Sequence, residues 1–265
     1  MNLTLFKKET KSNTILLLIF LAVLGMYSVM IIAMFDPKLG DSLRAMAQSM
    51  PQIFAAFGMA DVGTTLLEST TGYLYGLLFV AFPSVFIIIL AGRLVARYVD
   101  NGSMAYLLAV PVKRRRIVRT QAIFLITCLV LMVAYVTGLI LLTSHIMFQG
   151  EMEIPAFLRV NVGLLGLLVF MGGACFLPSC LFNDSKTAIG IGTAVVVYSI
   201  LVQMISQVGD KFENLKYATP LTLFDIKGLA ASDGGAWLTC GILYAAGLIL
   251  IVAGIEAFSR RNLPV

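Results

Sequence analysis

Charged residues are confined to the ends of six long apolar stretches, and this pattern restricts the fold more than any other feature of the chain. Each stretch is longer than twenty residues and contains no Asp, Glu, Lys or Arg. The stretches are Ser12–Phe35, Ser69–Gly92, Thr120–Gly150, Val160–Asn183, Thr187–Gly209 and Gly234–Ile255. Because a helix needs about 20 apolar residues to cross the hydrocarbon core of a bilayer, each stretch can span it once. We therefore expect an all-α integral membrane protein with six transmembrane helices.

Composition and span length leave room for one membrane domain. Only 12% of the 265 residues are charged, whereas soluble domains average about 25%. The first apolar run is longer than the roughly 7–15 residues of a signal-peptide core, so we expect it to remain as a span. Residues 1–265 are therefore expected to form a single transmembrane domain. Its spans are predicted at about residues 15–35, 70–92, 120–144, 160–182, 187–207 and 236–256.

The distribution of charge predicts the orientation of the chain. The N-terminal segment, the loop 93–119 and the C-terminal tail are rich in Lys and Arg. Most of the acidic residues fall in the other three connections, 36–69, 145–159 and 208–235. Because cytosolic loops of membrane proteins are enriched in Lys and Arg, we expect both termini in the cytosol and these three loops outside. The same distribution assigns the net charge of +5 to membrane topology, and nucleic acid is not an expected partner.

Short amphipathic helices are expected at the membrane interfaces. Residues 1–13 can place two apolar side chains on one side of a helix and three lysines on the other. In the loop 36–69, apolar residues recur at helical spacing, which predicts a helix at the outer interface. The loop 208–235 is half apolar, so we expect it to dip back against the membrane as short helices.

The loop 93–119 combines seven basic residues with an apolar segment. A cluster typical of a turn and a helix start comes first, and its side chains can cap a short helix. This cluster is Asp100, Asn101, Gly102 and Ser103. The helix is expected to begin near Met104 and to end before Pro111, because a residue that precedes proline disfavours the helical conformation.

The apolar segment Met104–Val110, here called the apolar island, needs cover in a water-exposed loop. One interpretation is that it tucks under the protein's own bundle or into the interface. The other is that it docks into a groove on a cytosolic partner, since exposed apolar patches mark interaction sites. The basic run that follows, Lys113–Arg116, is interpreted as a topology and lipid anchor.

Two prolines fall inside the expected spans. Pro83 lies in the second span and Pro178 in the fourth. An interior proline removes one backbone hydrogen bond, so both positions predict helix kinks. The fourth span is also rich in glycine, which lets neighbouring helices approach closely.

Motifs of catalysis and metal binding are missing from the sequence. A GxxxxGK[ST] phosphate loop, an HExxH motif and a GxSxG motif are all absent, so we expect neither a catalytic nor a cofactor-binding site in this chain. One histidine, His145, and four cysteines without metal-type spacing predict no metal site. The middle of each span lacks a carboxylate, which weakens the case for an ion-coupled carrier without excluding it, since backbone carbonyls can also bind cations.

Two segments carry a resemblance to a known family. Tyr98–Gln121 reads YVDNGSMAYLLAVPVKRRRIVRTQ, and Leu215–Ile226 reads LKYATPLTLFDI. The first is similar to the acidic-Gly-Ser start, short coupling helix, proline and basic re-entry of type-2 ABC exporter permeases. The second is similar to the segment before the last span in that family. The chain departs from the pattern at Asp100, where many members carry Glu.

The resemblance implies a non-catalytic subunit of a bacterial plasma-membrane exporter. Two permeases, identical or related, would enclose the substrate path, and two separate cytosolic ABC ATPase subunits would bind ATP and Mg²⁺. Residues 1–11 would lie along the inner membrane face. The residues implied in ATPase coupling are Asp100, Asn101, Gly102, Ser103, Met104, Tyr106, Leu107 and Leu108 in the first inner loop, and Asp184, Ser185 and Lys186 in the second.

Other classes remain open at this stage. A stand-alone channel or secondary carrier would also use six spans, and so would a membrane-embedded scaffold or immunity protein. The spans are rich in Met and Phe, which would suit drugs, antimicrobial peptides or lipid-like compounds as substrates. Because such side chains face lipid just as readily, the sequence does not choose among these substrates.

Overall fold

The computed structural model describes residues 2–35, 49–56, 65–102, 113–208 and 210–261. Within these residues no strand occurs, and six helices are long and apolar enough to cross a membrane. They are α1 (Leu3–Ala33), the continuous helix Leu66–Asp100, α8 (Arg114–Met147), α9 (Ile154–Leu181), α10 (Ser185–Ser206) and α12 (Gly234–Arg260). The expected all-α fold with six spans is confirmed.

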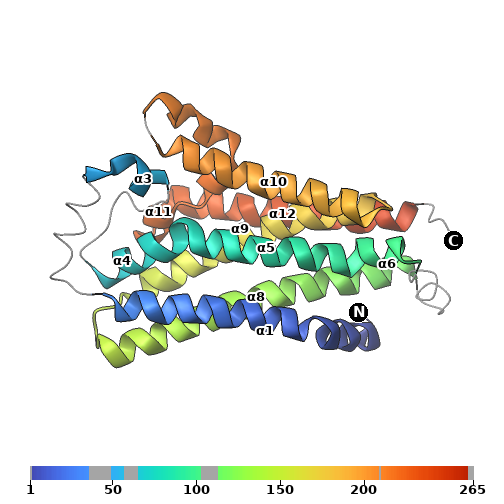
Figure 1. Cartoon of the computed structure of the whole chain (residues 1–265), viewed down its shortest axis with the longest axis horizontal. Helices are drawn as coiled ribbons and strands as arrows, with labels where there is room; N and C mark the ends of the chain where they lie inside the picture. The colour runs from blue at the N-terminus through green and yellow to red at the C-terminus, as the bar shows by residue number, and fades with distance from the viewer. Residues whose placement is uncertain (1, 36–48, 57–64, 103–112, 209, 262–265) are drawn as a thin grey trace.

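The spanning helices lie side by side along the long axis of the molecule (Figure 1). At one end of the bundle, α1 begins, α6 (Arg97–Asp100) ends and α12 ends, so the two termini lie at the same end. We call this the α6 end. At the opposite end lie α3 (Pro51–Ala56), α4 (Leu66–Tyr73) and α11 (Ile226–Ala230), and we call it the α11 end.

The second spanning helix changes its hydrogen-bonding pattern twice. After α4 comes a π-helical turn, η2 (Leu74–Leu78), then α5 (Phe79–Ala91), a second π-helical turn, η3 (Gly92–Ala96), and finally α6. The two π turns were not expected from the sequence. Such turns interrupt the regular i to i−4 ladder and often occur at functional sites. Pro83 lies inside α5 and Pro178 inside α9, and the kinks at these prolines remain predictions.

Helix α9 is the centre of the bundle, and its contact with α12 is a direct backbone contact. A Cβ atom at Gly173 would lie 2.6 Å from the Gly247 carbonyl oxygen. A Cβ at Gly247 would lie 2.7 Å from the Phe170 backbone nitrogen. Helices in lipid have no hydrophobic driving force to associate. Close approach of this kind stabilises their association through dispersion contacts instead. The tight packing expected from the glycines of the fourth span is therefore present.

The N-terminal segment is the first part of α1. The Asn2 side chain caps the helix by accepting hydrogen bonds from the amides of Thr4 and Leu5. The backbone amide of Asn2 donates a hydrogen bond to Thr120 Oγ1 of α8 at 2.9 Å. The expectation of a lead-in helix separate from the first span is therefore wrong for residues 3–11, while their position along the inner membrane face remains a prediction. They continue without a break into the span, because neither Pro nor Gly interrupts them and the cap starts the helix at Leu3.

Short helices form in the loop 208–235, as expected. They are η4 (Asp210–Ala218), η5 (Pro220–Leu223) and α11, the first two of the 3₁₀ type. Leu229 of α11 is fully buried and packs where Gly163 leaves room on α9. Arg159 Nε donates to the Leu229 carbonyl at 3.0 Å, and this carbonyl also accepts from the Ser232 backbone amide at 3.1 Å. Of the helix expected in 36–69, α3 is described, and residues 36–48 and 57–64 lie outside the described residues.

The glycine contact between α9 and α12 gives a stability prediction. Gly173→Ala places a methyl group against the Gly247 carbonyl, so we expect it to lower the stability of the protein by about 1–3 kcal/mol. The matched control is Gly241→Ala on α12, where an added Cβ meets nothing within 4 Å. Thermal unfolding in detergent checks the pair. Equal melting temperatures for the two variants would show that the close contact contributes nothing.

Candidate functional site

The α6 end brings the two predicted inner segments into contact. Asp100 is the last residue of α6, and Ser185 is the first residue of α10. The Ser185 hydroxyl donates a hydrogen bond to Asp100 Oδ2, although the two residues are 85 positions apart. After Asp100 the chain turns at Asn101 and Gly102, and Gly102 has a φ of +66°, a conformation that glycine adopts without strain. The start of the loop 93–119 and the α9–α10 turn, predicted as the first inner loop and the second inner turn, therefore form one junction.

Five of the predicted coupling residues lie outside the described residues. They are Ser103, Met104, Tyr106, Leu107 and Leu108. The two interpretations of the apolar island therefore both remain predictions.

Asp184 organises the second inner turn. Its side chain caps α10 by accepting hydrogen bonds from the amides of Lys186 at 3.2 Å and Thr187 at 2.9 Å. It also accepts from the Thr187 hydroxyl at 2.6 Å. The Thr187 hydroxyl, together with the two amides, lowers the pKa of the Asp184 carboxyl below its ordinary value of 3.8. Asp184 and Lys186 are both exposed, so the turn presents charged side chains to the surroundings.

Arg261, which follows the last turn of α12, also contacts this turn. Its Nη1 donates to the Cys180 carbonyl at 2.9 Å, and its Nη2 donates to Asn183 Oδ1. Its own carbonyl accepts from Arg114 Nη1 of α8 at 3.1 Å. Sequence reasoning missed Arg261 as a contact residue, because a basic residue after the last span is sufficiently explained by topology.

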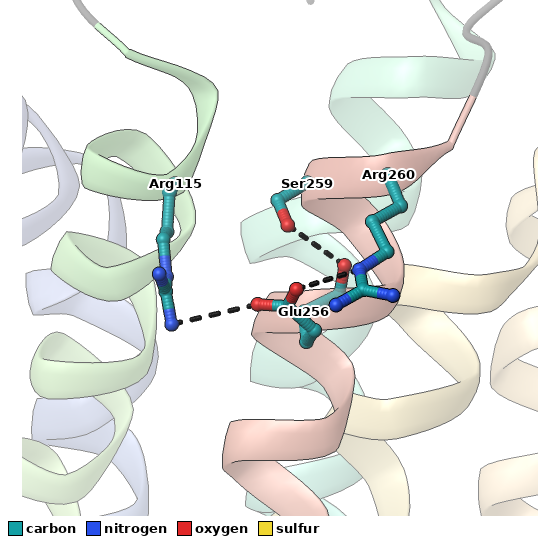
Figure 2. A network of polar contacts seen from close by, with 4 residues as sticks. All are labelled: Arg115, Glu256, Ser259 and Arg260. Atoms are coloured by element: carbon teal, nitrogen blue, oxygen red, sulfur yellow. Dashed lines mark hydrogen bonds and ion pairs between the residues drawn. The ribbon is translucent and has the colours of Figure 1, made fainter.

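A second set of contacts joins the basic run to α12 (Figure 2). Glu256 Oε2 lies 3.4 Å from Arg115 Nη2 of α8, and Glu256 Oε1 lies 2.6 Å from Arg260 Nε one turn along α12. The Glu256 carbonyl accepts from the Ser259 hydroxyl at 2.8 Å. The two arginine side chains are largely exposed and Glu256 is partly exposed, and ion pairs near the surface contribute about 0–1 kcal/mol. Arg114 and Arg115 thus also contact the end of α12, in addition to their interpretation as part of a lipid and topology anchor.

A buried carboxylate links α1 to α6. Glu9 is almost fully buried, and its Oε1 accepts a hydrogen bond from the Tyr98 hydroxyl at 2.8 Å. Asn13 Nδ2 donates to Glu9 Oε2 at 3.3 Å. Lys8 Nζ lies 5.1 Å from the centre of the Tyr98 ring, which is within the range of a cation–π contact. The sequence gives no sign of this cluster, because Glu9 stands among lysines that resemble a solvated headgroup-level segment.

At the α6 end, polar contacts join the ends of separate helices. Within the described part of the chain, no group of three or more His, Cys, Asp or Glu side chains could hold a metal ion. All four cysteines are buried, in agreement with their interpretation as small apolar residues. What the α6 end offers is a set of hydrogen bonds and ion pairs between the ends of α1, α6, α8, α9, α10 and α12. A displacement of one of these elements would therefore act on the others.

The fold and this site define a multi-pass membrane protein in which polar contacts join the ends of six helices at the α6 end of the bundle. Comparison with known families gives the particular family. The family model described as ABC-2 family transporter protein matches residues 3–263. The chain belongs to this family and is an ABC transporter permease, so the resemblance seen in the sequence is confirmed. Membership implies association with an ABC ATPase. No curated protein matches the chain significantly.

The cap of α10 gives a prediction about pH. Because hydrogen bonds lower the pKa of Asp184 in the folded state, the carboxylate stabilises the fold above about pH 3.8, and this contribution is lost as the pH falls through the folded-state pKa. Asp184→Asn keeps an N-cap side chain that does not titrate. We therefore expect the difference in melting temperature between the protein and this variant to shrink on going from about pH 6 to about pH 3.

Thr187→Val is the companion variant for this experiment. It removes the hydroxyl that contributes most to the lowered pKa and leaves the carboxylate in place. The pH dependence of its melting temperature should lie between those of the protein and of Asp184→Asn. Identical acid dependence in all three proteins would contradict the role of the cap.

Proposed function

We propose that the chain is the membrane subunit of an ATP-driven exporter in a bacterial plasma membrane. Two copies, or this chain and a related permease, would enclose the substrate pathway, and two separate ATPase subunits would bind ATP and Mg²⁺ beneath them. The observation that carries this proposal is the Asp100–Ser185 contact, since it joins the two segments that the family resemblance assigns to the ATPase. The chain itself would contribute no catalytic residue.

Charge supports a cytosolic position for the α6 end. Lysines and arginines gather there from α1, the loop 93–119, the start of α10 and the end of α12. At the α11 end, the connections 145–159 and 208–235 carry six of the acidic residues. The positive-inside rule then places both termini and the ATPases on the cytosolic side.

The transport cycle that we propose begins at the first inner loop. ATP binding would close the ATPases and displace the coupling helix, whose residues Asp100–Leu108 would sit in their groove. The displacement would pass through α6 into the second spanning helix. That helix contains Pro83 and the turns η2 and η3, which interrupt regular hydrogen bonding and allow a change of shape. Nucleotide would thereby bias a pathway with inward-open and outward-open states.

Drugs, antimicrobial peptides and lipid-like compounds are the substrate classes that we propose. The uncharged stretches of the spans supply apolar contacts in quantity and few charged partners. A pathway lined by them would bind apolar or amphipathic molecules better than small ions.

The coupling proposal predicts the behaviour of the apolar island. The permease should co-purify in fixed stoichiometry with an ABC ATPase. Leu107→Asp or Leu108→Asp should lower the ATP hydrolysis that is coupled to transport by about tenfold or more, because a charge in an apolar docking groove costs about 2 kcal/mol or more. Met50→Asp, at the α11 end, is the control and should leave coupling unchanged. Intact coupling in both leucine variants would show that the island does not dock.

The orientation is tested by cysteine labelling in intact cells. Glu151→Cys in the α8–α9 turn and Lys186→Cys in the first turn of α10 introduce exposed thiols at opposite ends of the bundle. A membrane-impermeant maleimide should label the first and spare the second, and it should label both after the cells are opened. The four native cysteines are buried and should give little background. The reverse labelling pattern would place the α6 end outside.

A further inference from the structure

We infer that Arg261 is a positioning residue for coupling, which ties the far end of the first inner loop to the second inner turn. The inference rests on the proposed function, because it assumes that these two segments receive the motion of the ATPase. It adds a residue that neither the coupling motif nor the family resemblance includes. The reasoning starts from the three hydrogen bonds that Arg261 makes.

These hydrogen bonds join three different parts of the bundle. The Arg261 guanidinium donates to the Cys180 carbonyl in the last turn of α9 and to the Asn183 side chain in the α9–α10 turn. The Arg261 carbonyl accepts from Arg114 at the first turn of α8. Arg261 therefore links α8, which follows the first inner loop, to the α9–α10 turn, which is the second inner turn.

These bonds close a ring of contacts around the first inner loop. At the start of the loop, Asp100 is bonded directly to Ser185 in the second turn. At its end, Arg114 is bonded to Arg261, which is bonded to Asn183 in the same turn. Both ends of the loop are thereby held to the α9–α10 turn. A force on the loop would then act on α9, the central helix, as well as on α6 and α8.

The chemistry of the site favours arginine. The last carbonyls of a helix lack partners within the helix and carry the negative end of its dipole, so a cation beside Cys180 is stabilised there. The planar guanidinium offers several N–H groups in a fixed fork, and it reaches a backbone carbonyl and an amide oxygen at once. A lysine ammonium would supply the charge without this fixed geometry.

The neighbouring residue, Arg260, provides a matched control. Its guanidinium is largely exposed, and the partner that the structure describes for it is Glu256, four residues earlier in the same helix (Figure 2). Arg260→Ala and Arg261→Ala therefore remove the same charge from adjacent positions. They differ in whether a contact between separate elements is lost.

The experiment uses the permease–ATPase complex in lipid nanodiscs. Glu151→Cys at the α11 end serves as the reporter, and its rate of labelling by a maleimide is measured with and without ATP plus vanadate. We expect Arg261→Ala to keep the ATPase bound in normal stoichiometry and to reduce the ATP-dependent change in labelling rate at least about threefold. Arg260→Ala should keep the full change. Asn183→Ala, a milder variant that removes one of the two acceptors, should give an intermediate value.

The possible outcomes separate the inference from the proposed function. If Arg261→Ala and Asn183→Ala respond to ATP as Arg260→Ala does, Arg261 has no positioning role, while the permease assignment stands. An equal loss in Arg260→Ala would also overturn the inference, because it would assign the effect to charge alone. Failure of the unsubstituted chain to bind an ATPase, or to respond to ATP, would reject the proposed coupling and this inference together.

Discussion

The need to satisfy every backbone hydrogen bond within the chain governs this structure, because the hydrocarbon core of a bilayer offers no water to do so. Long helices meet this need, and some polar side chains inside them also bond to a carbonyl of their own helix. Ser28 donates to the Leu24 carbonyl at 2.7 Å, and Ser84 donates to the Val80 carbonyl at 2.6 Å. Gln121 of α8 is an exception, since it is buried and both of its side-chain amide atoms lack a partner among the described residues. With their backbone groups satisfied internally, the helices associate through close packing, of which the Gly173–Gly247 contact is the clearest example.

The same constraint explains why the candidate site lies at an end of the bundle. Charged side chains cost little where water and headgroups are near, so the contacts that charged side chains make with other helices gather at the helix ends. At the α6 end these contacts involve the starts of α1 and α8, the ends of α6 and α12, and the α9–α10 turn. The exposed contacts among them are individually weak, and under the proposed function their value would lie in joining elements that move as a unit.

Much of this organisation was predictable from the sequence. The six uncharged stretches predicted the spans, and the glycines of the fourth span predicted its tight packing. The turn around Asp184 was recognised through the family resemblance. Arg261 and Glu9 were not recognised, since a basic residue after a span and an acidic residue among lysines are each explained by topology alone. The two π turns also left no sequence signal, because they depend on how the second span packs against its neighbours.

The sequence by itself determined the class, because the length and the lack of charge of an apolar run suffice to decide whether it can cross a bilayer. Helix starts such as Asn2 and Asp184 were likewise local, since an N-cap involves only a few neighbouring residues. The tertiary structure decided which charges meet. Asp100 and Ser185 are 85 positions apart, and Arg114 and Arg261 are 147 apart. Local patterns carry no information on such pairs, which are brought together by the packing of the helices.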